Sequence, residues 1–524
     1  MGLANFFDKN MLAASHVLKG LDASGLREVL KSTKIGIAFT TEDANSFETR
    51  TILELTVNLI ARLYPDILIL LQGNQEILGK TLANSLIETA RAINPDIEIT
   101  VASNSNDVSA ILAIGLCKLP SNHPCIYIGS DGWIAKVSTQ EPVSCGSTRN
   151  PFGAAAAACF GAANLFRIIF NDYLEQGDID RHIIFSLLDF SFNKANVENP
   201  SLSRTQLGES FLIGVGAIGN GAIWALSKLE DIEGKLHLID PENIETTNLQ
   251  RYVLCTQNDI GKSKVEVAGS LIAKSSLEVS LHPQQWGEYL NSRSNFHLER
   301  VAVAVDSAKD RCSIQASLPQ WIVNAWTQLG NLGVSKHEFL GDFACLMCLY
   351  LPNEKQKNED MLIAEAVGLS SELMLVRELL YKNTPMGYEV VEKIARSHNI
   401  SVDEILEYQD KPLRTFYTEA ICGGVILALK VDAQDDVFRA EVPLAFQSAL
   451  AGILLASELV IHANKLRQTI IPNVTSLNLL KPLTEHILAP VKKHTSGYCI
   501  CQDEDYISVY KSKYVIEKQT RETM

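Results

Sequence analysis

The chain has 524 residues, of which 46% are hydrophobic, so it is too long for one ordinary domain and can bury two or three cores. Its formal net charge of −15 argues against nonspecific binding to nucleic-acid phosphates or to an anionic membrane, and it favours a protein partner. Eleven cysteines over this length do not resemble a secreted disulfide framework, and close pairs among them indicate metal binding or catalysis.

Neither a secretory signal nor a membrane span is expected. Residues 1–30 contain scattered charges and therefore lack the apolar core of a signal peptide. The most apolar long segment, residues 444–461, is interrupted by two serines, a glutamine and a glutamate, so we predict a buried helix there. We expect a cytoplasmic protein that binds neither nucleic acid nor a membrane.

Residues 1–198 alternate apolar strand-like runs with helix-like runs, which is the pattern of an open α/β sheet. Strands are predicted at residues 35–39, 67–71, 97–101 and 125–128, with helices between them at 47–63 and 78–93. A helix rich in small residues is predicted to begin near residue 150. None of these strands is followed by a glycine-rich phosphate loop, so composition and periodicity alone indicate an unrelated α/β domain.

A turn-rich segment, residues 198–205, marks the predicted boundary before a second α/β domain. An apolar run at residues 211–213 is followed by three glycines and a helix-like run, the strand, turn and helix order of a phosphate-binding loop. The glycines are Gly214, Gly216 and Gly219. Glycine lets the backbone approach phosphate and a helix N-terminus favours an anion, although such a turn can also serve only for close packing.

A second predicted strand, residues 235–239, ends on Asp240, where such a fold places an acid on a ribose hydroxyl. Two polar segments follow, the sequence NLQR at residues 248–251 and the sequence GKSK at residues 261–264. A dehydrogenase has no need of these segments, whereas an asparagine, an arginine and a lysine at this place can hold a triphosphate.

With these four motifs in this order, residues 203–506 resemble the adenylation domain of the ubiquitin-activating enzyme and ThiF superfamily. The resemblance implies an ATP site in which the three glycines cradle the phosphates and Asp240 binds the ribose. It assigns the triphosphate to Asn248, Arg251 and Lys264. Arg204, ten positions before the first glycine, is a further candidate for the phosphates and is equally plausible as a surface arginine.

The sequence also departs from the family pattern. Tyr252 stands where relatives usually have glutamine, and Glu242 stands where a second aspartate is common. Neither departure removes a charge, but both bear on the geometry of the ATP site.

A dense β-branched run, residues 301–305, predicts a buried parallel strand that ends on Asp306. An acid at the carboxyl end of a sheet strand faces the nucleotide crevice. The resemblance assigns Asp306 to a magnesium ion, with Arg311 nearby, and hard oxygen ligands beside a triphosphate suit this ion. The alternative is that Asp306 is only the N-cap of the next helix.

Two close pairs of cysteines are far apart in the sequence. They are Cys345 with Cys348, and Cys499 with Cys501. Each pair can present two thiolates to one tetrahedral zinc ion, and four thiolates leave no open coordination position, so such a site is structural. Many relatives carry C-x-x-C twice, which makes the C-x-C of the second pair a departure. Buried apolar cysteines or a redox pair are the alternatives.

Between these pairs lies a charged, helix-like insertion, residues 349–440. Its single cysteine, Cys422, is followed by Gly423 and Gly424, which leave the sulfur sterically open to a peptide terminus. In activating enzymes that pass their cargo on as a thioester, a cysteine of an inserted segment attacks the acyl-adenylate. The resemblance therefore makes Cys422 the candidate nucleophile, with an ordinary buried cysteine as the alternative.

The resemblance implies an α/β fold of two Rossmann-like adenylation-type domains that pair within one chain, the first degenerate and the second active, with a small helical insertion that carries the cysteine. The active domain is expected to resume at residue 441 with a long apolar helix, and residues 506–510 are predicted to form a strand. The expected domains are residues 1–198 (inactive), 199–348 with 441–510 (active), 349–440 (insertion) and 511–524 (tail).

The resulting hypothesis is an enzyme that uses ATP to adenylate the C-terminus of a ubiquitin-like protein and transfers it to Cys422 and then to a conjugating enzyme. Bacterial members with a degenerate half, an active half and a short cysteine insertion occur in ubiquitin-like conjugation operons linked to phage defence, and this architecture resembles theirs. The alternatives are a ThiF-type adenylyltransferase for sulfur transfer or nucleoside modification, in which Cys422 is incidental, and a nucleotide-binding scaffold without turnover.

Overall fold

The computed structural model describes most of the chain. The described residues are 3–15, 17–73, 76–102, 107–119, 123–194, 196–272, 276–328, 330–351, 359–421, 442–484 and 487–522. They form two compact units. The larger unit consists of Met1–Phe6, Val17–Tyr350 and Pro443–Met524, and the smaller of Phe7–His16 and Leu351–Val442. Within the larger unit we call residues 17–198 the first half and residues 199–350 with 443–522 the second half.

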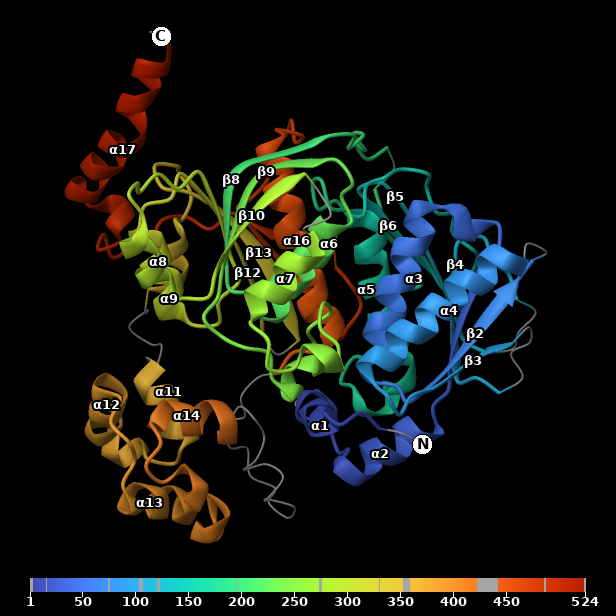
Figure 1. Cartoon of the computed structure of the whole chain (residues 1–524), viewed down its shortest axis with the longest axis horizontal. Helices are drawn as coiled ribbons and strands as arrows, with labels where there is room; N and C mark the ends of the chain where they lie inside the picture. The colour runs from blue at the N-terminus through green and yellow to red at the C-terminus, as the bar shows by residue number, and fades with distance from the viewer. Residues whose placement is uncertain are drawn as a thin grey trace. The chain divides into compact units, whose positions relative to one another are not determined.

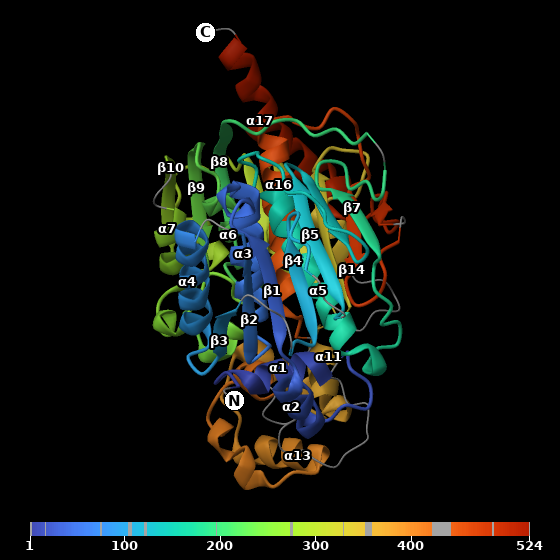
Figure 2. The same ribbon diagram turned by 90° about the vertical axis from the view of Figure 1, so that its right-hand side faces the viewer.

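The first half is built on a seven-stranded sheet of order β3-β2-β1-β4-β5-β6-β7. Strands β1 to β5 and β7 are labelled in Figure 2, and β6 is labelled in Figure 1. Its strands are β1 Ile35–Thr40, β2 Asp66–Gln72, β3 Glu98–Ala102, β4 Ala110–Ile114, β5 Cys125–Asp131, β6 Ile134–Ser138 and β7 His182–Ser186. The first five strands are parallel, and the pairs β5–β6 and β6–β7 are antiparallel. All four predicted strands form, and β4, a fully buried apolar run, adds to them.

The second half repeats this topology. Its sheet has the order β10-β9-β8-β11-β12-β13-β14-β15, so in both sheets the first strand is central and the next two strands lie on one side of it. The strands are β8 Thr205–Ile213, β9 Ile232–Ile239, β10 Leu277–His282, β11 Arg300–Val303, β12 Trp321–Thr327, β13 Asn331–Glu338, β14 Val474–Asn478 and β15 Leu488–Ala489. Again the first five are parallel and the later pairs antiparallel. The predicted fold class of two Rossmann-like α/β sheets is confirmed.

The helices follow the strands as a doubly wound fold requires. In the first half they are α2 Ala23–Ser32, α3 Phe47–Ile60, α4 Glu76–Ile93 and α5 Phe152–Ile169, with 3-10 turns at Asp43–Asn45 and Asn171–Tyr173. In the second half they are α6 Ala217–Ser227, α7 Lys264–Ile272, α8 Trp286–Ser292, α9 Ala308–Ala316, α10 Leu346–Tyr350, α16 Ala445–Ala463 and α17 Glu504–Glu522, with 3-10 turns η3 Thr246–Gln250, Gln257–Asp259 and Ile500–Gln502.

The two sheets meet through a layer of helices that includes α3, α5, α6 and α16 (Figure 1). α16 packs closely on α6, because Gly452 and Gly221 let the two backbones approach; a Cβ on Gly452 would lie 2.1 Å from the carbonyl oxygen of Ile218. On its other side α16 contacts α5, where the rings of Phe166 and Phe446 are 5.8 Å apart. α5 and α16 are long and apolar enough to span a membrane, but 89% and 94% of their residues are buried inside the protein, as core helices are.

The smaller unit is helical, as predicted for the insertion. It contains α1 Phe7–Ser15, α11 Glu359–Ala366, α12 Leu373–Lys382, α13 Tyr388–His398 and α14 Leu413–Phe416, 3-10 turns at Ser370–Glu372, Val402–Glu404 and Leu406–Tyr408, and a π-helical turn at Tyr417–Ile421. It has a hydrophobic core of its own, with Val367, Ile394 and Phe416 fully buried. The candidate nucleophile Cys422 lies outside the described residues.

The predicted strand at residues 506–510 is wrong, because these residues belong to the helix α17. Tyr506, Tyr510 and Tyr514 recur at the helical spacing of four, and the ring of Tyr510 stacks on Phe339 at 4.9 Å. The β-branched and aromatic composition of this run resembles a strand, but the spacing of its tyrosines decides the structure.

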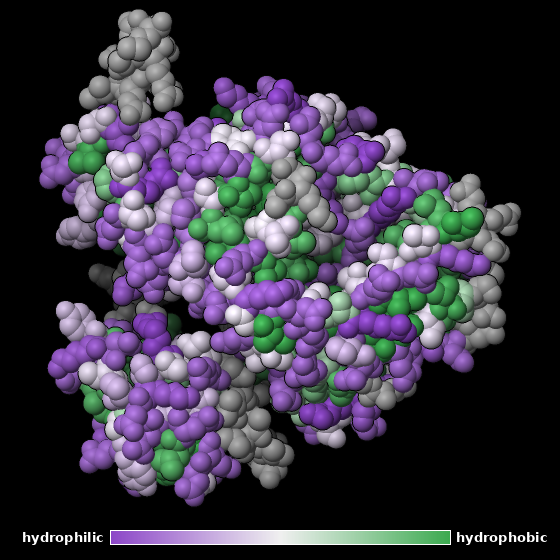
Figure 3. All heavy atoms as spheres, in the orientation of Figure 1, coloured by the Kyte–Doolittle hydropathy of each residue, from purple (hydrophilic) through white to green (hydrophobic). Residues whose placement is uncertain are grey.

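Most of the surface seen in Figure 3 is hydrophilic, but hydrophobic residues gather over α7 and the edge strand β10. Leu271 and Leu281 there are 39% and 40% exposed.

Candidate functional site

The glycine loop lies between β8 and α6, as predicted. Gly214 has a φ of +90°, and a Cβ at this position would lie 2.6 Å from the carbonyl oxygen of Ala304, just beyond the end of β11. A Cβ on Gly219 would lie 2.3 Å from the carbonyl oxygen of Gly214. Gly216 is the N-cap of α6 and has no side chain, so the first turn of the helix can present its N–H groups to an anion. The loop therefore requires glycine for its geometry and offers an anion site.

Asp240 follows the end of β9 and is buried beside this loop. Its Oδ2 accepts a hydrogen bond from the backbone N–H of Val215 at 2.7 Å, and its Oδ1 accepts one from Glu242 at 2.9 Å. Burial raises the pKa of Asp240, and the positive charge of Lys264 opposes this shift. The predicted ribose acid thus also fixes the glycine loop.

Lys264 begins α7 and is 5% exposed. Its ammonium forms an ion pair with Glu242 and lies 5.3 Å from the ring centre of Tyr252. Burial alone lowers the pKa of Lys264, but Tyr252, Asp240 and Glu242 outweigh it, and the pKa is raised. Lys264 is therefore a stable cation at the edge of the loop, with Glu242, one of the two family departures, as its carboxylate partner.

The segment with Asn248 and Arg251 lies near Lys264, because Arg251 and Lys264 both lie close to the ring of Tyr252. Asn248 Oδ1 accepts a hydrogen bond from the N–H of Glu245 at 2.9 Å, so in this structure it shapes the turn η3. Arg251 ends that turn, and its guanidinium carbon is 6.0 Å from the ring centre of Tyr252. The hydroxyl of Tyr252 lies 3.5 Å from the place of a Cβ on Gly216. Tyr252, the other residue that departs from the family pattern, therefore lies between the glycine loop and the two cations, Arg251 and Lys264.

Asn220 is a site residue that our sequence reasoning missed. Its Nδ2 donates to the carbonyl oxygens of Val215 and Gly216 at 2.9 and 3.0 Å, and its Oδ1 accepts from the N–H of Leu254 at 3.2 Å. It therefore ties the glycine loop to the chain that follows Arg251. The signal in the sequence was a lone polar side chain in the first turn of an otherwise apolar helix.

Asp306 lies exposed beyond the carboxyl end of β11. It is not the helix cap, because Ser307 is the N-cap of α9 and accepts from the N–H of Asp310 at 3.0 Å. Arg311 is buried and donates to Asn324 Oδ1 at 3.0 Å and to the carbonyl oxygen of Asp306 at 3.4 Å. An exposed carboxylate beyond the carboxyl end of a parallel strand is suited to serve as an oxygen ligand for magnesium.

Arg204 lies at the other end of the sheet. It precedes the nine-residue strand β8, whose far end carries the glycine loop, so roughly 25–30 Å of strand separates the two. Its side chain is 60% exposed and forms an ion pair with Glu233. This separation removes Arg204 from the site proposed below.

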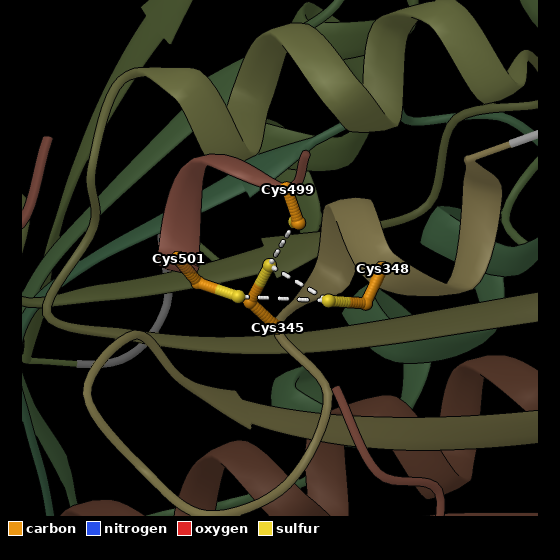
Figure 4. Close-up of side chains that lie close together, drawn as sticks. All are labelled: Cys345, Cys348, Cys499 and Cys501. Atoms are coloured by element: carbon orange, nitrogen blue, oxygen red, sulfur yellow. Dashed lines mark hydrogen bonds between the residues drawn. The ribbon is translucent and has the colours of Figure 1, made fainter. Parts of the chain in front are cut away.

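The four cysteines of the predicted zinc site come together (Figure 4). All four sulfur atoms lie within 4.8 Å of one another, with 3.4 Å between Cys345 and Cys499 and 3.5 Å between Cys348 and Cys501. Four sulfurs bound tetrahedrally at the usual Zn–S length would be about 3.8 Å apart, so the geometry fits zinc. The backbone N–H of His494 lies 3.3 Å from the sulfur of Cys348, as an outer hydrogen bond to a metal thiolate would.

Comparison with known families tests the resemblance that the sequence motifs indicate. A model of the ThiF family matches residues 193–499, more than half of the chain. The chain belongs to the ThiF family. Membership of this family supports adenylation as the chemistry of the nucleotide site. A second model, described as Prokaryotic E2 family C, matches residues 38–171 of this ThiF-family protein.

Among curated proteins, this ThiF-family chain is 41% identical over 514 residues to the uncharacterised protein y4jF of Sinorhizobium fredii, and the match covers 98% of both chains. It is 27% identical over 140 residues to the tRNA threonylcarbamoyladenosine dehydratase of Haemophilus influenzae, a match over 25% of this chain and about half of that enzyme. Among solved structures, Escherichia coli MccB with ATP is 14% identical, with 56% of this chain and 67% of MccB covered and a TM-score of 0.33, too low to assign a function.

The first half of this ThiF-family chain has acidic residues where the second half has the glycine loop. Glu48, in the first turn of α3, is fully buried and accepts hydrogen bonds from Ser130 and from the N–H and hydroxyl of Thr148. Asp43 lies between the ends of β1 and β4, 2.7 Å from the place of a Cβ on Gly115. Carboxylates at this position, in place of a glycine loop, would disfavour the binding of a triphosphate.

Burial also affects the thiols of the first half. Four cysteines lie within the region matched by the E2 family model: Cys117, Cys125, Cys145 and Cys159. Burial raises the pKa of Cys117 and Cys145 to about 12 and that of Cys125 to about 11, and it raises the pKa of Cys159 as well. A raised pKa lowers the thiolate fraction at neutral pH, which disfavours these thiols as nucleophiles.

Proposed function

We propose that this protein uses ATP to adenylate the C-terminal carboxylate of a ubiquitin-like protein, takes the acyl group onto Cys422 as a thioester, and passes it to a conjugating enzyme. The observation that carries the adenylation step is the convergence of the glycine loop, Asp240, Arg251 and Lys264, joined through Asn220 and Tyr252. The degenerate first half then serves as a scaffold for the active half. The setting we propose is a bacterial, cytoplasmic conjugation system with an antiviral role.

The residues have distinct parts in the first step. The glycine loop and the N-terminus of α6 receive phosphate oxygens, and Asp240 holds the ribose. A carboxylate oxygen of the protein substrate attacks the α-phosphorus, the bond to the bridging oxygen breaks, and pyrophosphate leaves. Arg251 and Lys264 stabilise the negative charge that develops on the phosphates, and Asp306 would hold magnesium, which adds positive charge there.

In the second step the thiolate of Cys422 attacks the carbonyl carbon of the acyl-adenylate, and AMP leaves as a thioester forms. Sequence supports this role, because two glycines follow the cysteine. Its place in the chain supports it too, since residues 359–421 before it fold into a separate helical unit. The match of the first half to a prokaryotic E2 model supports a conjugation pathway, because E2 denotes the conjugating enzymes of such pathways.

A specific comparison favours a second candidate. The similarity to a tRNA threonylcarbamoyladenosine dehydratase supports a ThiF-type enzyme that acts in nucleoside modification without a cysteine thioester. Cys422 separates the two candidates. In the second candidate, Cys422→Ala retains full turnover.

The test uses purified protein, ATP and a ubiquitin-like protein encoded in a neighbouring reading frame. We expect ATP–pyrophosphate exchange in the unaltered protein and in Cys422→Ala, and a thiol-labile adduct on a nonreducing gel in the unaltered protein alone. The matched control is Cys312→Ser, a half-buried cysteine of α9 outside the cluster, which should keep the adduct. An adduct that survives Cys422→Ala would refute the thioester, and no exchange with any such partner would refute the adenylation.

A further inference from the structure

Arg62 belongs to the first half, but its guanidinium binds the backbone of the second half. It follows the C-terminal end of α3 and is 1% exposed. Nη1 donates to the carbonyl oxygen of Leu249, and Nη2 donates to that of Cys255 at 3.1 Å. Nε donates to Oδ1 of Asn58, one turn earlier in α3, at 3.1 Å. The arginine is thus held in one orientation by its own helix while it contacts the other half.

The two carbonyl groups lie on either side of Arg251, two residues before it and four residues after it. Asn58 contacts the same segment, because its Nδ2 donates to the carbonyl oxygen of Val253 at 2.9 Å. The first half therefore holds residues 249–255 at three backbone carbonyls. Leu249, Val253 and Cys255 are all buried, so water cannot easily replace these bonds.

The second half holds this segment from the opposite direction. Asn220 accepts from the N–H of Leu254 and donates to the glycine loop at Val215 and Gly216. The chain on both sides of Arg251 is consequently fixed to α3 of the first half and to the glycine loop of its own half. Geometric precision of this kind is what a catalytic cation needs, because a small displacement weakens its contact with the developing charge.

Burial of the Arg62 guanidinium costs free energy, because the charged group loses its contact with water. Burial lowers the pKa of Arg62 to about 10, which still leaves it protonated at neutral pH. The carbonyl dipoles of the segment and the C-terminal end of α3 are favourable neighbours for this charge.

We propose that Arg62, with Asn58, is a positioning residue through which the first half holds Arg251 in place for the triphosphate. This inference rests on the nucleotide site proposed above. In this proposal the degenerate half takes part in ATP binding indirectly, because it positions Arg251 and does not itself contact ATP.

The test measures the affinity of the full chain for α,β-methylene-ATP by calorimetric titration. Arg62→Met keeps an unbranched side chain but removes the guanidinium, so the carbonyl groups lose their donor, and we expect the Kd to rise about tenfold or more, which equals ~1.4 kcal/mol. Arg62→Lys should recover part of this loss, because an ammonium group can still donate to a carbonyl. Asn58→Ala removes the bond to Val253 and the acceptor of Arg62 Nε but leaves both bonds from Arg62 to the segment, so it should raise the Kd by roughly threefold.

The matched control is Arg167→Met. Arg167 is as deeply buried as Arg62, but its partners are Asn164, Asp178 and Asp180 in the first half. We expect this variant to lose as much thermal stability and to keep its Kd within about twofold. An unchanged Kd in Arg62→Met, or an equal loss in Arg167→Met, would overturn the proposal. If Arg62→Met does not fold, an unchanged Kd in Asn58→Ala would overturn it. If the unaltered protein does not bind the analogue, the nucleotide site itself is refuted, and this result is distinct from the others.

Discussion

The two halves of the larger unit have the same strand order but differ in the loop after their first strand. After β8 this loop is glycine-rich, and Gly214 packs against the carbonyl oxygen of Ala304 at the end of β11. After β1 the corresponding place, at the end of β4, contains the carboxylate of Asp43. A parallel sheet of this order places the loop after its first strand where ligands bind in such folds, and the two halves differ in the residues at that loop.

Under the proposed function, the first half contributes to a nucleotide site that lies in the second half. α3 in the first half follows β1, as α6 follows β8. α6 points its N-terminus at the glycine loop, whereas the C-terminal end of α3 provides Asn58 and Arg62 for the segment around Arg251. Under the proposed function, opposite ends of these equivalent helices serve the same nucleotide site.

The largest expected effect concerns the two cations of the second half. Arg251→Ala and Lys264→Ala should each slow ATP–pyrophosphate exchange by about 10²–10³-fold, because each removes a charge that stabilises the phosphates as the reaction proceeds. Initial exchange rates at saturating protein substrate measure this. Arg204→Ala is the control, since Arg204 lies at the far end of β8, and its rate should stay within about twofold of the unaltered protein. Equal losses in Arg204→Ala would contradict the placement of the site.

A second prediction concerns the cluster of four cysteines. Among the described residues, such a cluster is found in the second half and not in the first. Cys348→Ser should reduce the zinc content from about one ion per chain to almost none and should lower the Tm by roughly 5 °C or more, because an ion bound by the four cysteines would join α10 to the C-terminal segment. Elemental analysis and thermal unfolding measure the two effects. Cys312→Ser should keep both values. A zinc-free unaltered protein would show that the cluster is only a group of buried thiols.

The smallest effect is a difference in pH dependence. His462, near the end of α16, stacks on Trp321 and accepts from Arg300 Nε at 3.3 Å. Burial, with the charge of Arg300, lowers the pKa of His462 to about 4 from its usual 6.5. Between these values the unfolded chain binds more protons than the folded chain, so this contribution to stability is complete above pH 6.5 and is lost as the pH falls toward 4.

We therefore expect the Tm of the unaltered protein to fall more steeply than that of His462→Gln between pH 6.5 and 4.5, by roughly 2 °C. Thermal scans of both proteins at matched ionic strength measure the difference. Parallel curves would show that His462 does not titrate in this range.

The sequence allowed the prediction of those candidate site residues whose residue type is itself required by the local geometry or chemistry. Gly214 is forced by a positive φ and a close backbone contact, and four cysteines in two pairs indicate one ion. Arg62 could not be found in this way, because its partners in the second half are backbone carbonyls 187 and 193 positions away, which any residue type supplies. Arg204 was expected near the phosphates because it is only ten positions before Gly214 in the sequence. Those positions form the extended strand β8, so Arg204 lies a full strand length from the glycine loop.

Calorimetric titration of α,β-methylene-ATP into the intact chain tests the central comparison most directly. We predict a single bound molecule per chain and no measurable binding in Arg251→Ala. Two molecules per chain would show that the first half binds nucleotide despite Asp43 and Glu48. A single molecule that remains in Arg251→Ala, or no binding at all, would contradict the assignment of the site to the glycine loop of the second half.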